Sequence, residues 1–514
     1  MSNFSKAELL ALLRLDFLAF AQKSFQALSP SEPFKPNWHH QAIAYRLERC
    51  LRGECKRLLI TLPPRSLKSH LVSVCLPAFL MGHNPSVKII TASYAQGLSE
   101  DFSGKTRTLM QEDWYREAFP DTQLSSTKNS LGEYATNKRG LRLATSVHGS
   151  LTGRGADCII LDDAHKAEEA FSDACRERTV NWFENTLLSR LNNMKDGCII
   201  VVQQRIHEHD LAGHLLAKGG WDHLRLQAIA EEDQNVPLAD GEFHEFKAGD
   251  VLHEAIYGQD ALDERRAAVG SYIFSAQYQQ EPVPAGGNLI PISKFQRYGV
   301  APSKQPGDLI VQSWDLAQGR KETNDYSVGT TWLVRGAICF LLDVVREKVG
   351  YRDLQMRIQS SAHNFDADYI LIENASVGVS MIEDVRAAGW FNVIECNPRT
   401  DKVARMTPGT ADIEGGRVAL PQEALWLADF ERECSAFPNG VHDDQVDSLS
   451  QFLEWARSHS REQVSFNTLE CALRELTPPP SGNIGGKTNA AFYRSLQGSN
   501  PRNLGHIVDI PRYR

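Results

Sequence analysis

Residues 57–69 read RLLITLPPRSLKS, and this stretch decides the fold of the first half of the chain. The run Arg57–Leu62 is β-rich and apolar, which predicts a buried strand. A loop follows it and ends in Lys-Ser before a predicted helix, the usual setting of a nucleotide phosphate site. There, backbone N–H groups hold the phosphates, the lysine reaches the β and γ oxygens, and the serine hydroxyl binds Mg²⁺. The candidate nucleotide-binding residues of this loop are Pro64, Arg65, Ser66, Leu67, Lys68 and Ser69.

The loop alone is a weak signal, because the standard pattern has glycine where this chain has Leu62 and Leu67. A solvated helix start is the alternative. A second feature supports the nucleotide site: the apolar run Cys158–Leu161 leads directly into Asp162 and Asp163. A carboxylate at the end of a buried strand can order Mg²⁺, and a second acid can polarise the attacking water, although Asp also caps helices. Together the two features favour nucleoside triphosphate hydrolysis.

Further polar residues flank these two motifs. Trp38 and Gln41 could stack on adenine and bond its edge, or Trp38 could instead anchor a helix. Gln204 and Arg205 follow the apolar run 198–202 and could sense the γ-phosphate. The cluster His207-Glu208-His209-Asp210 lacks the spacing of metal ligands, so a helix-start role for its aspartate is favoured.

A second set of acids lies in the other half of the chain. Asp315 and Glu373 each end a predicted strand, and Asp443, Asp444 and Asp447 lie at the start of a predicted helix. Carboxylates from two strand ends and one helix can converge on two Mg²⁺ or Mn²⁺ ions about 4 Å apart, as phosphodiester cleavage requires. Crowded acids destabilise a fold unless cations offset them, although a solvated helix face for Asp447 is equally compatible with the pattern.

The apolar runs also predict the fold class, which is α/β. In the first half, near-continuous apolar strands alternate with helices, which indicates a parallel sheet flanked by helices. The segment 228–285 shows no such strands. Three strands and then alternating helices and strands in the second half indicate a mixed sheet. We therefore predict an ATPase domain at 1–285, a nuclease domain at 286–460 and a mildly basic, partly disordered tail at 461–514.

The composition excludes several classes of protein. The chain has 514 residues, 42% hydrophobic and 23% charged, and a net charge of −9, which is typical of a globular protein and not of a polycation. No apolar stretch is long enough for a membrane span, and the N-terminus reads as an amphipathic helix. The ten cysteines form no CxxC pair, so reduced core cysteines in a cytosolic protein are expected.

At this point the sequence resembles the large terminase subunit of tailed bacteriophages, from Trp38 to Leu453. Each motif is short, but the whole set in this order is specific. The motifs that carry the resemblance are Trp38–Gln41, Pro63–Ser69, Thr152–Asp157, Leu161–Asp163, Arg205–Gly213, Gln277–Glu281 and His442–Asp447. The stretch Gln277–Glu281 has no chemistry that the sequence assigns, so it serves only as a marker.

The resemblance implies a P-loop ATPase that drives double-stranded DNA into a capsid, followed by an RNase H-like nuclease that cuts concatemeric DNA. It implies that Arg65 contacts the γ-phosphate and that Gln204 and Arg205 couple hydrolysis to movement. The implied cofactors are ATP, Mg²⁺ in the ATPase, and two Mg²⁺ or Mn²⁺ in the nuclease, with Asp315, Glu373 and Asp443 or Asp444 as the nuclease acids. The implied partners are DNA, a small terminase subunit and the capsid portal, on which a ring of copies would act in the host cytoplasm. The tail is the candidate for portal docking.

Two departures from the family pattern leave alternatives open. Leu67 replaces a usual glycine, and its Cβ would strain the loop. Asp163 replaces a usual glutamate, so Glu168 or Glu169 could instead position the water. A nuclease or resolvase with an inactive ATPase half is therefore the main alternative; a translocase without cutting and a capsid-associated structural protein are the others.

Overall fold

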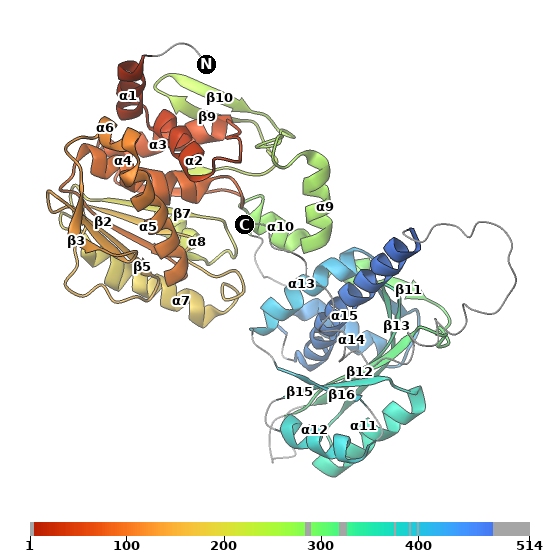
Figure 1. Ribbon diagram of the computed structural model, residues 1–514. Helices are drawn as coiled ribbons and strands as arrows, with labels where there is room; N and C mark the ends of the chain where they lie inside the picture. The colour runs from red at the N-terminus through yellow and green to blue at the C-terminus, as the bar shows by residue number, and fades with distance from the viewer. Residues whose placement is uncertain are drawn as a thin grey trace, which may run out of the picture. The chain divides into compact units, whose positions relative to one another are not determined.

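The structure is a computed structural model that describes residues 5–282, 289–317, 326–374, 377–389, 392–397, 400–440 and 442–475, with side chains up to residue 459. Most of the predicted tail, 461–514, lies outside these residues. Two large sheets form the framework (Figure 1).

The first sheet has eight strands in the order β3-β4-β5-β2-β6-β7-β1-β8. Its neighbours from β5 to β8 pair in parallel, whereas β3, β4 and β5 pair antiparallel. The predicted parallel sheet is therefore confirmed, with an antiparallel edge added. The strands are β1 (Arg57–Thr61), β2 (Lys88–Ser93), β3 (Leu124–Asn129), β4 (Glu133–Thr136), β5 (Leu141–Ser146), β6 (Cys158–Asp162), β7 (Cys198–Gln203) and β8 (Asp222–Arg225).

Helices cover both faces of this sheet because its strands are apolar on both sides (Figure 1). In β6, Ile160 belongs to the core under α2, α3 and α4, whereas Ile159 and Leu161 belong to the core under α7 and α8. The helices are α1 (Lys6–Leu15), α2 (Phe17–Leu28), α3 (Trp38–Leu51), the π-helix η1 (His70–Cys75), α4 (Leu76–His83), α5 (Gln96–Gln111), α6 (Asp113–Ala118), α7 (Asp173–Trp182), the π-helix η2 (Phe183–Leu187), the 3₁₀-helix η3 (Leu188–Arg190) and α8 (Leu211–Lys218).

The segment after β8 was expected to lack strands, and this expectation is wrong. It contains an antiparallel hairpin of β9 (Gln234–Ala239) and β10 (Glu242–Phe246), followed by α9 (Gln259–Val269) and α10 (Ser271–Gln277). Only three side chains of the hairpin, Val236, Leu238 and Phe246, are buried hydrophobics. A hairpin that is solvated on one side carries too few apolar residues to be recognised as a continuous run.

The second sheet has seven strands in the order β11-β17-β14-β13-β12-β15-β16. The pairs β12–β13 and β13–β14 are antiparallel, whereas β12–β15 and β15–β16 are parallel, so the predicted mixed sheet is confirmed. Its strands are β11 (Gln296–Tyr298), β12 (Leu309–Asp315), β13 (Ser327–Arg335), β14 (Ile338–Glu347), β15 (Tyr369–Glu373), β16 (Asn392–Cys396) and β17 (Val418–Pro421).

Two cores lie on the two faces of this sheet. One contains Val311 with residues of α13, α14 and α15, and the other contains Trp314 with residues of α11 and α12. No helix within the described ranges combines the length and the apolar character needed to span a membrane. The helices are η4 (Ile292–Lys294, 3₁₀), α11 (Tyr351–Phe365), α12 (Val377–Ala387), α13 (Lys402–Glu414), α14 (Leu427–Ala436) and α15 (Asp444–Glu475).

Candidate functional site

The phosphate loop joins β1 to η1 and brings the predicted basic and acidic residues together. Lys68 is only 7% exposed, and its Nζ donates to Oδ1 of Asp163 at 2.5 Å. Ser69 Oγ donates to Oδ1 of Asp162 at 3.1 Å. The contact forms because β1 and β6 are separated in the sheet by β7 alone and run in the same direction, so their carboxyl ends share one edge.

Asp162 is the most enclosed acid of this site. It is 1% exposed, and its second oxygen accepts a hydrogen bond from Ser73 Oγ at 2.6 Å. Burial, and then the neighbouring charge of Asp163, raise the pKa of Asp162 to about 7, although Lys68 and the two serines act in the opposite direction. No motif in the sequence indicated Ser73. The signal for it is its position four residues after Ser69, one helical turn further on.

The backbone of the site is strained at three residues that are not glycine. Arg65, Leu67 and Asp163 have φ values of 66°, 57° and 48°. In this left-handed region a Cβ costs about 1–2 kcal/mol per residue. The strain expected at Leu67 is therefore present in the loop.

Tyr257 supports the strained loop, a role that no pattern along the chain indicated. Its hydroxyl lies 2.9 Å from Ser66 Oγ and donates to the carbonyl oxygen of Pro64. Ser66 Oγ in turn donates to the carbonyl of Pro63 at 2.8 Å. Burial raises the pKa of Tyr257 to about 12, so the hydroxyl keeps its proton at neutral pH.

Trp38 and Gln41 lie on the first turn of α3 and are both half-buried. The Trp38 ring stacks on His244 of the hairpin, with ring centroids 4.2 Å apart, and also contacts Phe246. These contacts agree with the helix-anchoring alternative. A contact of Trp38 or Gln41 with adenine stays a prediction.

Gln204 and Arg205 follow directly after β7 and contact two different acids. The backbone N–H of Gln204 donates to Asp163 Oδ1 at 3.2 Å, which links this residue directly to the phosphate site. Arg205 is buried, and its Nε lies 3.0 and 3.1 Å from the two carboxylate oxygens of Asp210. Asp210 caps α8 by accepting a hydrogen bond from the Gly213 N–H, so the helix-start role predicted for it is confirmed.

The marker stretch Gln277–Glu281 acquires a structural explanation. Gln280 is 2% exposed and accepts a hydrogen bond from the Arg205 N–H at 3.0 Å. Gln279 pairs with the backbone of Ile229. This stretch therefore ties the end of β7 to the segment that follows β8.

One alternative water-positioning residue, Glu169, is exposed, and so is the other, Glu168. The Glu168 side chain is 65% exposed and pairs with Lys166 at 2.9 Å. Asp163, by contrast, is in contact with Lys68. Asp163 is therefore better placed than either alternative.

The acids of the second half converge as predicted. Asp315 ends β12, Glu373 ends the neighbouring strand β15, and Asp444 and Asp447 lie in the first turn of α15. Burial raises the pKa of Asp315 from 3.8 to about 8, and the charges of Asp447, Glu373 and Asp444 add to this shift. Asp447 is 6% exposed, so the alternative of a solvated helix face is wrong for it.

Two cations from α13 balance these acids, and no motif in the sequence indicated either of them. Lys402 Nζ lies 2.8 Å from Asp443 and 2.7 Å from Asp447. Arg405 contacts Asp447 at 2.8 Å and Glu373 at 3.5 Å. Burial acts to lower the pKa of Lys402, but its hydrogen bonds to the two aspartates outweigh burial and raise it. A basic pair three residues apart on one helix was the available signal.

A buried polar network fixes α15 against the sheet and so positions the acids. Ser448 Oγ donates to the carbonyl of Ser313 at 2.8 Å, and Ser313 Oγ donates to the carbonyl of Ser448 at 2.8 Å. Gln451 adds a hydrogen bond to Ser313 Oγ. These bonds lie next to Asp315 on β12 and Asp447 on α15, so the distance between the two acids is set by the core.

Comparison with known proteins decides what this second sheet is. Residues 312–455 match the family model of the terminase RNaseH-like domain. This stretch contains β13 to β17, most of β12 and α11 to α14, and we call it the terminase RNase H-like domain after this match. The resemblance to the large terminase subunit is thus confirmed for this part of the chain.

One solved structure supports the same fold, and two others are similar at lower scores. A large terminase from a thermophilic bacteriophage is 9% identical, with a TM-score of 0.50 over 82% of this chain and 98% of that one. The same phage protein in complex with ATP-γ-S is 10% identical, with a TM-score of 0.47 over 82% and 98%. A large terminase nuclease of thermophilic phage G20c with bound magnesium is 16% identical, with a TM-score of 0.27 over 33% and 98%. None of the curated proteins matches the chain.

The acids of the terminase RNase H-like domain fit divalent metal ions. Carboxylate oxygens are the donors that Mg²⁺ and Mn²⁺ prefer. Asp444 has a buried carboxylate oxygen, Oδ2, without a hydrogen-bond partner, and burial, then Glu433 and Asp443, raise its pKa. An acid held protonated or unpaired in this way gains from a cation, so Asp315, Glu373, Asp443 and Asp444 remain the predicted ligands.

Proposed function

We propose that the chain is the large subunit of a viral terminase. It would use ATP to move double-stranded DNA into a capsid and cut concatemeric DNA with a divalent-metal endonuclease. The observation that carries this proposal is the presence of two carboxylate sites in one chain. One faces Lys68 of the phosphate loop, and the other lies at Asp315 in the terminase RNase H-like domain.

For ATP hydrolysis, Lys68 would leave Asp163 and bind the β and γ oxygens, since phosphate competes for the same ammonium group. Asp163 would then be free to accept a proton from the attacking water. Ser69 and Asp162 would hold Mg²⁺, and Arg65 would contact the γ-phosphate. Gln204 would respond when Lys68 releases Asp163, because the Gln204 N–H is bonded to this carboxylate.

For DNA cleavage, Asp315, Glu373, Asp444 and Asp443 would hold two Mg²⁺ or Mn²⁺ ions, which supply a deprotonated water and charge stabilisation at the leaving oxygen. Lys402 and Arg405 would release the acids and turn toward the DNA phosphates. Phosphate contacts make DNA binding depend on salt and little on sequence. A small terminase subunit and the capsid portal would be the protein partners.

The second candidate is a nuclease whose ATPase half is inactive. The observation that favours it is the left-handed φ of 57° at Leu67, where a side chain strains the phosphate loop.

Two activities measured on three proteins separate the candidates. Wild type, Lys68→Ala and Asp315→Ala are assayed for DNA-stimulated ATP hydrolysis and for cleavage of supercoiled plasmid with Mn²⁺. The motor predicts that Lys68→Ala loses ATP hydrolysis and still cuts, and that Asp315→Ala does the reverse. Equal and negligible ATP hydrolysis in wild type and Lys68→Ala would support the inactive-ATPase candidate, and uncut plasmid with wild type would exclude the nuclease.

A further inference from the structure

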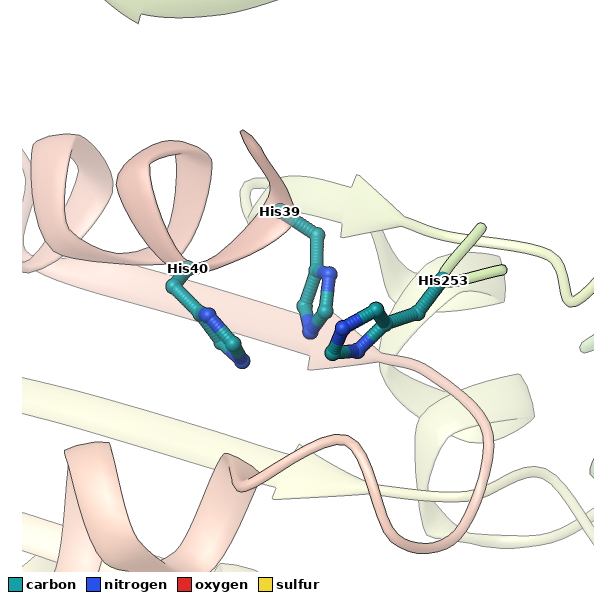
Figure 2. Close-up of side chains that lie close together, drawn as sticks. All are labelled: His39, His40 and His253. Carbon is teal, nitrogen blue, oxygen red and sulfur yellow. The ribbon is translucent and has the colours of Figure 1, made fainter. Parts of the chain in front are cut away.

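Three histidines gather beside the phosphate loop and have no part in the proposed chemistry. They are His39 and His40 on the first turn of α3, and His253 in the segment between β10 and α9. Figure 2 shows their rings converging from these two segments. One nitrogen from each ring lies within 4.8 Å of the others, and among the described residues no other group of histidine, cysteine or acid side chains meets this criterion.

The three rings are buried, and several of their nitrogens lack a hydrogen-bond partner of good geometry. The exposed fractions are 0% for His39, 1% for His40 and 5% for His253. The nitrogens concerned are both of His39 and the Nε2 atoms of His40 and His253, although the backbone of Ser66 approaches His39 closely enough to act against the lowering of its pKa. His40 Nδ1 accepts a hydrogen bond from the Asn37 N–H at 3.2 Å. A buried polar atom without a partner costs about 1–3 kcal/mol, so several in one place point to a ligand that satisfies them.

The chemistry of the rings restricts which ligand this is. Burial, and then the neighbouring histidines, lower the pKa of His40 to about 3, and burial first also lowers the pKa of His39 and of His253. The rings are therefore neutral near pH 7, and a neutral imidazole offers a lone pair to a metal ion. Apolar surroundings and three nitrogen donors without a carboxylate suit zinc better than Mg²⁺ or Ca²⁺.

The geometry also allows a metal ion. Zinc–nitrogen bonds of about 2.0–2.1 Å in a tetrahedron put the nitrogens about 3.4 Å apart. The present separations are within 4.8 Å, so side-chain shifts of about 1 Å would close the site. The Asn37 N–H donates to His40 Nδ1, so the proton of this neutral ring lies on Nε2 in the metal-free protein. Zinc would therefore take the His40 lone pair from the Asn37 N–H, with the ring proton on the nitrogen that does not bind the ion.

We infer that His39, His40 and His253 bind one zinc ion, which fastens the start of α3 to the segment that supports the phosphate loop. Asn37 Nδ2 already donates to the carbonyl of Leu252, next to His253, at 2.8 Å. Four residues further on, Tyr257 bonds Ser66 of the loop. The ion would therefore stabilise the residues beneath the phosphate loop, whether or not the loop hydrolyses ATP.

The test is zinc binding by the full chain that carries Asp315→Ala. This substitution weakens metal binding by the acids of the RNase H-like domain, so that it does not mask binding by the histidines. Zinc content per chain and the unfolding midpoint are measured before and after chelation for this protein, for His253→Gln and for His244→Gln. His244 is the matched control, since it is a half-buried neighbour of Trp38 outside the cluster. We expect one zinc per chain, a lower midpoint after chelation, and zinc affinity at least about 100-fold weaker in His253→Gln alone.

Cobalt substitution identifies the type of ligand from the absorption spectrum of the unaltered histidine cluster. Thiols could also take metal, because Cys50, Cys55 and Cys198 lie close together. Tetrahedral cobalt held by imidazoles absorbs in the visible without the strong near-ultraviolet thiolate band. A spectrum of this kind that His253→Gln abolishes supports the site. A thiolate spectrum, equal zinc content in His253→Gln and the control, or no bound metal would each overturn it.

Discussion

Around the phosphate loop one lysine faces the paired acids, whereas in the RNase H-like domain Lys402 and Arg405 together face a larger group of acids. Lys68 belongs to the same loop as the serine that binds Asp162. The two cations of the other site come from α13, while the acids come from β12, β15 and α15. Both sites join segments distant in sequence, since Lys68 lies 95 residues before Asp163 and Lys402 lies 41 residues before Asp443. They differ in the source of the cations: a single lysine of the phosphate loop itself, or a lysine and an arginine from a helix that contributes none of the acids.

The largest effect is expected for Asp162→Asn, which keeps the shape of the side chain and removes the charge that would hold Mg²⁺. ATP hydrolysis should fall by about 100- to 1,000-fold, while plasmid cleavage should stay within about twofold of wild type. The measurement is steady-state ATP hydrolysis with DNA present, and nucleotide binding serves as the control for folding. Unchanged hydrolysis would remove Asp162 from the mechanism.

The next effect concerns the stability of the metal-free RNase H-like domain. The folded pKa of Asp315 is about 8, above its usual 3.8, so the folded protein binds the extra proton between these values. Stability should therefore fall as the pH rises from about 4 to about 8. Asp315→Asn should remove this loss and stabilise the metal-free protein by about 1–3 kcal/mol at pH 8.

Denaturant unfolding at pH 5 and pH 8, with and without Mn²⁺, checks this prediction. The stabilising effect of Asp315→Asn should be smaller at pH 5, and Mn²⁺ should stabilise wild type more than the variant. If Asp315→Asn destabilised the protein at pH 8 in metal-free buffer, the neighbouring acids would not be repelling the charge of Asp315.

A smaller effect is expected when the strain in the phosphate loop is relieved. Leu67→Gly removes the Cβ at a φ of 57°, which should favour the bound loop by about 1 kcal/mol and tighten ATP binding several-fold. Titration with an ATP analogue measures this, and Leu67→Ala, which keeps a Cβ, is the matched control. Equal affinities of the two variants would show that the strain has no effect on binding.

The smallest effect is expected for Lys402 of the RNase H-like domain. Lys402→Gln removes a charge that competes with metal at Asp443 and Asp447. The Mn²⁺ concentration for half-maximal cleavage should fall by about two- to fivefold, because Lys402 is half-exposed and its pairing is partly screened. The exposed Lys166→Gln is the control. An increase in the required Mn²⁺ would mean that Lys402 assists metal binding.

The parts of the fold that were predicted are those with a strong local signal. The apolar runs at 57–62 and 158–161 became β1 and β6, because strands buried on both faces must be apolar throughout. The hairpin of β9 and β10 was missed because it is largely solvated. The acids Asp162, Asp315 and Glu373 were found because each directly follows an apolar run, but Tyr257 and Arg405 occur in stretches without such a pattern.

The sequence by itself determined where the strands end and which carboxylates stand there, since both follow from the order of apolar and acidic residues along the chain. Only the tertiary structure decided which cations face those acids and which histidines meet beside the phosphate loop. The physical reason is that a charge or a lone pair acts over a few ångströms in space. His253 and Lys402 reach His40 and Asp447 only after the chain has folded.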